Sequence, residues 1–282
     1  MTIKEINNLI EEAQSLKQIT QAFTQIASSK LKRIRSGVLK NRDFFKELSN
    51  IFVLINIIAK DRKIVPLPKN GKTLSLVLTS NQRFYGKITN ELIEFFLVQV
   101  SKIRSDKLII GKAGIESLKS VNYALSYKHM ILAGDFPTNE EFLTLSGYIN
   151  PYSKVLVFYP QFLSVLVQKP IIVDINQSEG QVGLETQVPE ELVTLIRNFI
   201  IEPEVKIMVD FFDSQIKILL LEAAFLEAEL ARTASRLISM DNAQNEAQKY
   251  LDTQEGLLLN AQRSIQNSRI LETIAAMKKS SF

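Results

Sequence analysis

The sequence predicts an α/β protein in which N- and C-terminal helices form a long antiparallel coiled coil around an inserted α/β domain. Three observations predict this fold. The stretch from Glu204 to Met277 has no proline and one glycine, Gly256, and is rich in helix-favouring residues. Residues 3–59 have the same character. The middle of the chain instead alternates short β-rich runs with helical ones. The expected domains are 1–63 (N-terminal helix), 64–190 (α/β domain) and 191–282 (C-terminal helix, paired with the first).

The N-terminal helix is expected over residues 3–59, before Pro66 and Pro68. Apolar or small residues recur along it at steps of three and four, which is the helical period. They are Ile3, Ile6, Ile10, Ala13, Leu16, Thr20, Phe23 and Ile26.

The middle segment is expected to form a mainly parallel, doubly wound sheet of the Rossmann-like kind, with a late antiparallel hairpin. Strands are expected at 73–79, 107–110, 127–133, 154–159, 163–174 and 182–187. Helices are expected at 84–101, 115–121, 139–149 and 190–201.

The C-terminal helix follows Pro203, which suits a first helical turn because the missing N–H would be unpaired there. Its apolar spacing averages near 3.5 residues, the period of a left-handed coiled coil. The positions are Leu226, Leu230, Thr233, Leu237, Met240, Ala243, Ala247 and Leu251. At 1.5 Å per residue such a helix is about 110 Å long, so a partner outside this chain must enclose part of it.

Composition excludes several kinds of site. The 282 residues contain no cysteine and one histidine, which excludes disulfides, thiolate metal sites, cysteine nucleophiles and multi-histidine metal sites. No cofactor and no metal are expected. The apolar run 51–59 is far shorter than the roughly 20 residues of a membrane span, and charges at Lys4 and Glu5 interrupt any signal peptide. We therefore expect a cytoplasmic protein.

The net charge of +4 comes from the N-terminal 60 residues, where ten Lys and Arg stand against five Asp and Glu. The basic residues centre on Lys30, Lys32, Arg33, Arg35, Lys40 and Arg42. By itself this stripe fits an acidic protein partner, nucleic acid or a solvated surface.

No catalytic motif is complete. Residues 70–73 (NGKT) end like a phosphate-binding loop, but Pro66 occupies the place of its first glycine and Thr73 opens a strand rather than a helix. Residues 111–114 (GKAG) are too short for a dinucleotide fingerprint. His129 has no nucleophile or carboxylate partner at a suggestive position. We expect a protein without catalytic residues.

Short motifs in both terminal helices resemble one known family. Residues 19–23 (ITQAF) and 26–31 (IASSKL) resemble the signature I-T-K-A-M…V-A-A-x-K-L of the gamma subunit of F-type ATP synthases. Residues 234–243 (ASRLISMDNA) resemble its A-A-R-M-x-A-M-x-N-A, and 260–263 (NAQR) its N-K-A-R. The loop 80–90 keeps Ser80, Gly86 and Asn90 of the family's S-D-x-G-L-x-G-x-x-N. The resemblance covers the whole chain in order.

Several positions depart from these motifs. Arg232 stands where the family has the acid of S-E-x-A-A-R-M, and Ser264 replaces the glutamine after N-K-A-R. The loop glycines are reduced to Gly86, and the family's C-terminal I-V-G-G-A is replaced by residues 274–279 (IAAMKK). These changes bear on individual contacts rather than on the architecture.

The resemblance implies a non-catalytic subunit, the central rotor shaft of an F-type ATPase or ATP synthase. The implied partners are a catalytic ring of alpha and beta subunits, an epsilon-like subunit and a membrane rotor ring, which would make the chain peripheral to the membrane through its complex. An acidic lever loop of the family's beta subunit would face the basic stripe. The residues expected to contact the ring are Ile19, Thr20, Phe23, Lys30, Lys32, Arg33, Asn260 and Arg263.

Two alternatives stay open at this point. One is a gamma-like rotor of a divergent F-type-like motor that is not coupled to proton transport, which the lost loop glycines and the altered C-terminal end suggest. The other is a free-standing coiled-coil scaffold or a nucleic-acid-binding arm. Nucleic acid is not expected as a partner, because no interleaved aromatic residues or groove-reading helix accompany the basic stripe.

Overall fold

A computed structural model describes residues 2–61, 70–121, 126–175 and 203–280 of the chain. The chain consists of two compact units. The first combines Met1–Ser28 with Arg236–Phe282, and the second is Ser29–Ser235. We call them the shaft unit and the sheet unit and describe each by itself. The expected strand 182–187 and helix 190–201 lie outside the described residues. The division of the chain at 64–190 remains a prediction.

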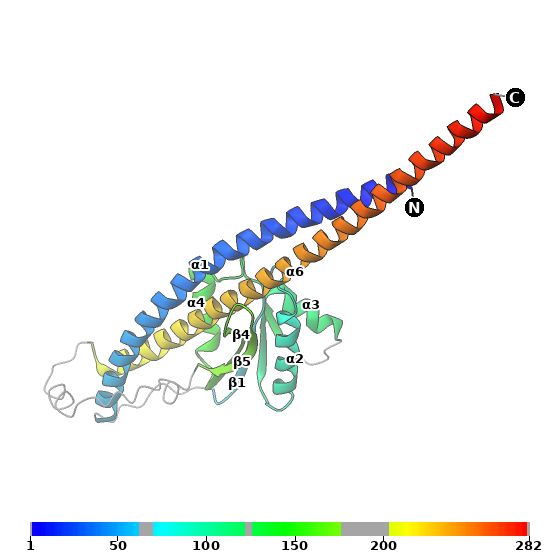
Figure 1. Cartoon of the computed structure of the whole chain (residues 1–282). Helices are drawn as coiled ribbons and strands as arrows, with labels where there is room; N and C mark the ends of the chain where they lie inside the picture. The colour runs from blue at the N-terminus through cyan, green and yellow to red at the C-terminus, as the bar shows by residue number, and fades with distance from the viewer. Residues whose placement is uncertain (1, 62–69, 122–125, 176–202, 281–282) are drawn as a thin grey trace. The chain divides into compact units, whose positions relative to one another are not determined.

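Two long helices supply residues to both units (Figure 1). Helix α1 spans Ile3–Asp61 and helix α6 spans Val205–Ser280. These bounds confirm the helices expected at 3–59 and 204–277. Among the described residues, no helix has a stretch long and apolar enough to cross a membrane.

The sheet unit contains a five-stranded sheet in the order β3-β2-β1-β4-β5. Strands β1, β2, β3 and β4 pair in parallel, and β5 pairs antiparallel with β4. This arrangement confirms the predicted parallel sheet with a late antiparallel hairpin. The strands are β1 (Thr73–Leu78), β2 (Asp106–Ile110), β3 (Lys128–Met130), β4 (Lys154–Phe162) and β5 (Gln168–Asp174).

Helices cover both faces of this sheet (Figure 1). On one face, α2 (Ile88–Val100) and α3 (Lys112–Ser120) bury a core that includes Phe96 and Phe158. On the other face lie α4 (Asn139–Ile149) and the early part of α6. Long helix α6 is therefore part of the core of the sheet unit.

Local sequence explains where α4 begins. The Thr138 side chain accepts a hydrogen bond from the Glu141 backbone N–H, and the Glu141 carboxylate accepts one from the Thr138 N–H. This reciprocal capping box pairs backbone donors that the first helical turn would otherwise leave unpaired. The observed bounds match the expected helix 139–149.

Other predicted boundaries were wrong, for reasons that lie in the backbone. Helix α2 begins at Ile88 rather than 84, because Phe84 and Gly86 have φ values of 67° and 61°, incompatible with a right-handed helix. Helix α3 begins at Lys112 rather than 115, directly after Gly111 with φ of 100°. Strand β3 has three residues instead of the expected seven, because only that segment pairs with β2.

Candidate functional site

The shaft unit is a helix pair with a narrow buried seam. On α1 the buried residues Ile6, Ala13, Thr20 and Ala27 follow one another at seven-residue intervals. On α6 the buried residues Met240, Ala247 and Gln254 repeat the same interval. A seven-residue repeat is the signature of a coiled coil, which confirms the predicted period.

The side of α1 that faces the seam differs from the prediction at two positions. Leu16 and Ile26 were expected in the apolar stripe, but their side chains are exposed. Ala27, which was not predicted, is buried instead of Ile26, and the predicted Ala13 is buried as expected. A strict seven-residue interval selects these positions, and small side chains let two helix backbones approach closely.

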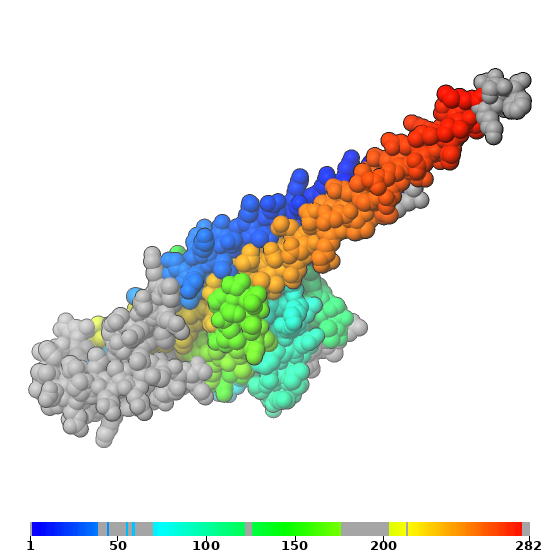
Figure 2. All heavy atoms as spheres, viewed as in Figure 1, coloured from blue at the N-terminus to red at the C-terminus, as the bar shows by residue number. Residues whose placement is uncertain are grey.

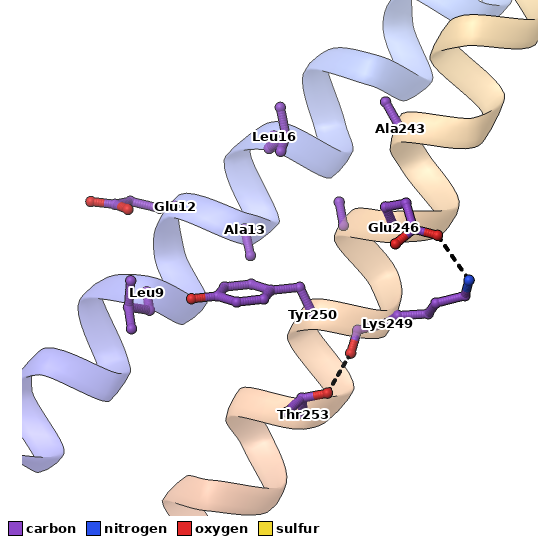
Figure 3. A pocket seen from close by; sticks show the side chains of 10 residues that line it. Leu9, Glu12, Ala13, Leu16, Ala243, Glu246, Lys249, Tyr250 and Thr253 are labelled. Atoms are coloured by element: carbon purple, nitrogen blue, oxygen red, sulfur yellow. Dashed lines mark hydrogen bonds and ion pairs between the residues drawn. The ribbon is translucent and has the colours of Figure 1, made fainter. Parts of the chain in front are cut away.

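The two helices of the shaft unit run antiparallel. In Figure 3, Leu9 lies across from Tyr250, and Leu16 lies across from Ala243. Further along α1, the ring of Phe23 lies 5.9 Å from the guanidinium carbon of Arg236. As the residue numbers rise along α1, the numbers of the facing residues on α6 fall.

A groove of about 660 Å³ opens between the helices of the shaft unit (Figure 3). Its floor contains Ala13 and Ala247, whose small side chains leave the space. Tyr250 projects toward α1, and Glu246 forms an ion pair with Lys249 at 2.8 Å on the α6 side. The groove gives this surface a mixed apolar and charged character.

The expected contact residues of the shaft unit differ in accessibility. The side chain of Ile19 is exposed and that of Phe23 is half-buried over Arg236. Thr20 is 3% exposed, and its hydroxyl donates within the helix to the carbonyls of Leu16 and Lys17. Ile19 and Phe23 are therefore accessible to a partner, whereas the Thr20 side chain is buried in the seam between the helices.

The residues of the basic stripe also differ in accessibility. In the sheet unit, Lys30 makes an ion pair with Glu229 of α6 at 2.7 Å, and the two side chains are 25% and 11% exposed. Lys32 and Arg33, on neighbouring positions of α1, are exposed. The side chains of Lys40 and Arg42 lie outside the described residues. Lys30 is thus paired with Glu229 of the same chain, while Lys32 and Arg33 face solvent.

The last turns of α6 are exposed on all sides. Asn260 and Arg263 are both exposed there. Large apolar side chains on the same turns, including Ile270, Leu271 and Ile274, are 56%, 67% and 56% exposed. Figure 2 shows these turns, in red, with no other coloured segment over them on the face in view. Exposed apolar side chains grouped in this way are typical of a surface that binds another protein or a membrane.

The strand ends of the sheet unit, where doubly wound folds bind ligands, are filled by the chain's own groups. The first amides of α3 are those of Lys112, Ala113 and Gly114, which donate to Asn81 Oδ1, the Ser80 carbonyl and Thr79 Oγ1 at 3.1, 2.9 and 3.0 Å. A Cβ on Gly111 or Gly114 would lie 2.7 Å from Thr79 Oγ1, so the packing is tight. The helix N-terminus that would hold a phosphate is occupied.

Other candidate sites are equally unsupported in the described residues. His129, in β3, is exposed, and no group of three or more His, Cys, Asp and Glu side chains there is arranged to hold a metal ion. The sequence reasoning missed Tyr250 and Arg236 as parts of the helix pair. Arg236 lies in a recognisable motif, whereas no sequence signal singles out Tyr250.

Comparison with known proteins gives a consistent result. The sequence profile of the ATP synthase family matches residues 2–270. The ATP synthase gamma chain of Staphylococcus saprophyticus is 22% identical over 267 residues, which is 89% of each chain. Gamma chains of Staphylococcus aureus are 21% identical over 270 residues, with the same coverage.

Solved structures share the fold. The rotor of Euglena gracilis mitochondrial ATP synthase is similar with a TM-score of 0.61 and 13% identity, over 94% of this chain and 98% of that one. A chain from the central stalk and c-ring structure of the Tetrahymena thermophila mitochondrial enzyme has a TM-score of 0.56 and 19% identity, over 80% and 99%.

Proposed function

Because the chain belongs to the ATP synthase family, among the gamma chains, we propose that it is the central rotor shaft of an F-type ATPase or ATP synthase. In this role the chain performs no chemistry. It couples ATP hydrolysis or synthesis in a surrounding ring of alpha and beta subunits to rotation. The helix pair presents a different face to each catalytic subunit as it turns, and so biases the conformation of each in succession.

One observation carries this proposal beyond family membership. The α1–α6 pair buries its own seam, yet the final turns of α6 keep Ile270, Leu271 and Ile274 exposed. A free-standing scaffold would leave this apolar surface in water, at a cost of roughly 25 cal/mol per Å² of apolar area. A ring that encloses the end of the shaft removes it from water.

The contact residues form part of the proposal. Accessibility supports Ile19, Phe23, Lys32 and Arg33 on α1, and Asn260 and Arg263 on α6. Buried Thr20 would act indirectly, by fixing the helix pair. Lys30 would act through its ion pair with Glu229 rather than as a free cation.

The remaining assignments follow from the same proposal. The α/β domain, residues 64–190, would form the foot of the shaft against an epsilon-like subunit and a membrane rotor ring. The chain would then be cytoplasmic and held to the membrane only through its complex. The similar structures support these partners, since one is a central stalk with a c-ring and another, from the Euglena gracilis enzyme, is an assembly of OSCP, F1 and c-ring.

Arg263→Ala tests the proposal in a reconstituted complex. The chain is coexpressed with the alpha and beta subunits of its own source, and ATP turnover is measured on complexes of verified stoichiometry. An arginine holds a carboxylate or carbonyl directionally and does not titrate, and the loss of one charge-assisted hydrogen bond costs about 1.5–3 kcal/mol. We expect intact assembly and turnover reduced at least roughly ten-fold, the value that the lower limit of this range gives.

Arg104→Ala, in the loop before β2 of the sheet unit, is the matched control, because it removes an exposed arginine far along the chain from the end of α6. Its turnover should equal that of the unaltered chain. Failure of the chain to assemble with the ring subunits would refute the rotor role. Normal turnover of the Arg263→Ala complex would show that Arg263 is not part of the contact surface.

A further inference from the structure

Six polar side chains converge within the sheet unit, at the carboxyl end of its sheet. Lys30 comes from α1, Tyr85 and Asp135 from loops at the carboxyl end of the sheet, and Glu229, Arg232 and Ser235 from α6. We call these six residues the junction cluster. All lie within the sheet unit. The sequence analysis singled out Lys30 and Arg232 and placed Ser235 in a family-like motif, but it gave no role to Tyr85, Asp135 or Glu229.

The centre of the junction cluster is Arg232. It is 2% exposed and is among the largest fully buried side chains described. Its guanidinium donates to the carbonyl of Asp135 at 3.4 Å and to that of Leu78, at the end of β1, at 3.5 Å. One arginine of α6 thus joins the end of β1 to the loop that contains Asp135.

The loop that contains Tyr85 is held from several directions. The Tyr85 hydroxyl donates to Asp135 Oδ2, and the Tyr85 carbonyl accepts from Ser235 Oγ at 2.7 Å. The Asn81 N–H donates to Asp135 Oδ1 at 2.7 Å, and the Asn81 side-chain amide donates to the Leu132 and Gly134 carbonyls. Both carboxylate oxygens of Asp135 therefore bind the 81–85 loop.

The charges of the cluster balance. Lys30 and Arg232 are cationic, Glu229 and Asp135 are anionic, and all four are buried or half-buried. Burial opposes ionisation of Asp135, but the Tyr85 hydroxyl, the Arg232 charge and the Asn81 amide together hold its pKa below the usual value. An acid at position 232, as in the family motif, would leave an excess of negative charge, which a buried site does not tolerate.

We propose that Arg232 and Asp135 form a lock that fixes the loop 81–85 to the part of α6 inside the sheet unit, so that this loop and this part of the helix turn as one body. Arg232 holds the Asp135 main-chain carbonyl, and the Asp135 carboxylate holds the loop. The loop has a feature that needs such a lock. Phe84 adopts a left-handed φ of 67° although it is not glycine, and its side chain is 63% exposed. A strained, exposed aromatic residue persists only where the surrounding structure holds it, and such strain is concentrated at functional sites.

The lock is tested on the full chain by hydrogen exchange, without any partner. Arg232→Met keeps the length of the side chain but removes its charge and donors. We expect the Asn81 and Lys112 amides, which bond to Asp135 and to Asn81, to exchange about ten- to a hundred-fold faster. Amides of β1 and β4 that pair within the sheet should keep their rates.

Two comparisons separate the lock from a general loss of packing. Asp135→Asn should accelerate the same amides. The double variant Arg232→Met/Asp135→Asn should be no faster than the faster single one, since the contact of Arg232 with the Asp135 carbonyl and the contacts of the Asp135 carboxylate with the loop act in series between α6 and the loop. Arg83→Met is the matched control. That arginine lies on the same loop, but its side chain is 76% exposed where it pairs with Glu116 at 3.4 Å, so the rates should not change.

Restoring a positive charge at position 232 gives a second test of the lock. Arg232→Lys retains the charge and should restore most of the protection. If Arg232→Met lowers the yield of folded chain, Arg232→Lys and Asp135→Asn carry the comparison. Unchanged exchange at Asn81 in Asp135→Asn, or multiplying effects in the double variant, would overturn the proposal.

The part of the proposal that concerns turning rests on the proposed rotor function. In the ring complex, Arg232→Met should lower ATP turnover and Arg232→Lys should restore it, whereas equal turnover in all three complexes would overturn the coupling of the loop to rotation. The exchange result does not depend on a ring. A chain that exchanges as expected but never assembles with ring subunits would refute the rotor function and leave the lock standing.

Discussion

Substitution of Phe225 by alanine tests how firmly α6 is held to the sheet unit. The Phe225 side chain is fully buried, and its ring packs edge-on against Phe142 and Phe136 with centroid distances of 5.7 and 6.3 Å. Phe142 lies on α4 and Phe136 precedes that helix. One aromatic side chain of the long helix thus fills the space between α6, α4 and the sheet.

The expected loss is large. A buried phenylalanine replaced by alanine costs about 3–5 kcal/mol, because apolar contacts are lost and a cavity remains. At about 2–4 °C per kcal/mol for a unit of this size, the lower limit corresponds to a fall in Tm of roughly 6–12 °C. Phe225→Leu, which retains most of the volume, should cost less than about 1.5 kcal/mol.

The assay is thermal unfolding of the full chain, followed by the near-ultraviolet circular dichroism of tyrosine. Tyr85, Tyr152 and Tyr159 are buried in the sheet unit and report on its packing. Phe211→Ala is the matched control on the same helix, since its ring is largely exposed, and it should cost no more than about 1 kcal/mol. A loss for Phe225→Ala as small as that of the leucine variant would refute the view that this side chain fixes α6 to the sheet.

Three further predictions concern the sheet unit. Gly111→Ala should cost more than about 1 kcal/mol in urea unfolding, because φ is 100° and the added Cβ would lie 2.8 Å from a backbone carbon, whereas Gly147→Ala, with open space around it inside α4, should be neutral or stabilising. Thr138→Ala should cost about 1 kcal/mol by removing the cap of α4, and Thr138→Ser should restore it; an equal loss in both variants would contradict the capping argument. The depressed pKa of Asp135 means that the folded chain binds fewer protons there than the unfolded chain, so its contribution to stability is complete above the ordinary pKa of 3.8 and is lost as the pH falls through the folded value. Urea midpoints measured from about pH 6 to pH 2 should therefore fall less steeply for Asp135→Asn than for the unaltered chain.

Features with a local physical cause could be predicted from the sequence. The long helices follow from helix-favouring composition, and the sheet from alternating β-rich and helical runs. The start of α4 follows from Thr138 and Glu141, whose side chains cap the helix without help from distant residues. The seven-residue period of the seam was also visible, because it depends only on spacing.

Features that depend on distant partners could not be predicted. Ala27, rather than its larger neighbour Ile26, faces α6, because the position of the partner helix selects the buried residue. Lys30 is engaged by Glu229, a residue almost 200 positions away. Asp135 acquires its role only when folding brings Tyr85 and Arg232 beside it. The segment before α2 has a helical pattern, but the left-handed Phe84 stops the helix.

The occupied strand ends of the sheet have a consequence for how the chain responds to its surroundings. Thr79, Ser80 and Asn81 accept the hydrogen bonds that a phosphate group would otherwise accept at the start of α3. A protein that binds a metabolite in its native state is stabilised in proportion to the logarithm of the metabolite concentration. Because this crevice already holds the chain's own acceptors, nucleotide added to the chain should not raise its Tm through this site.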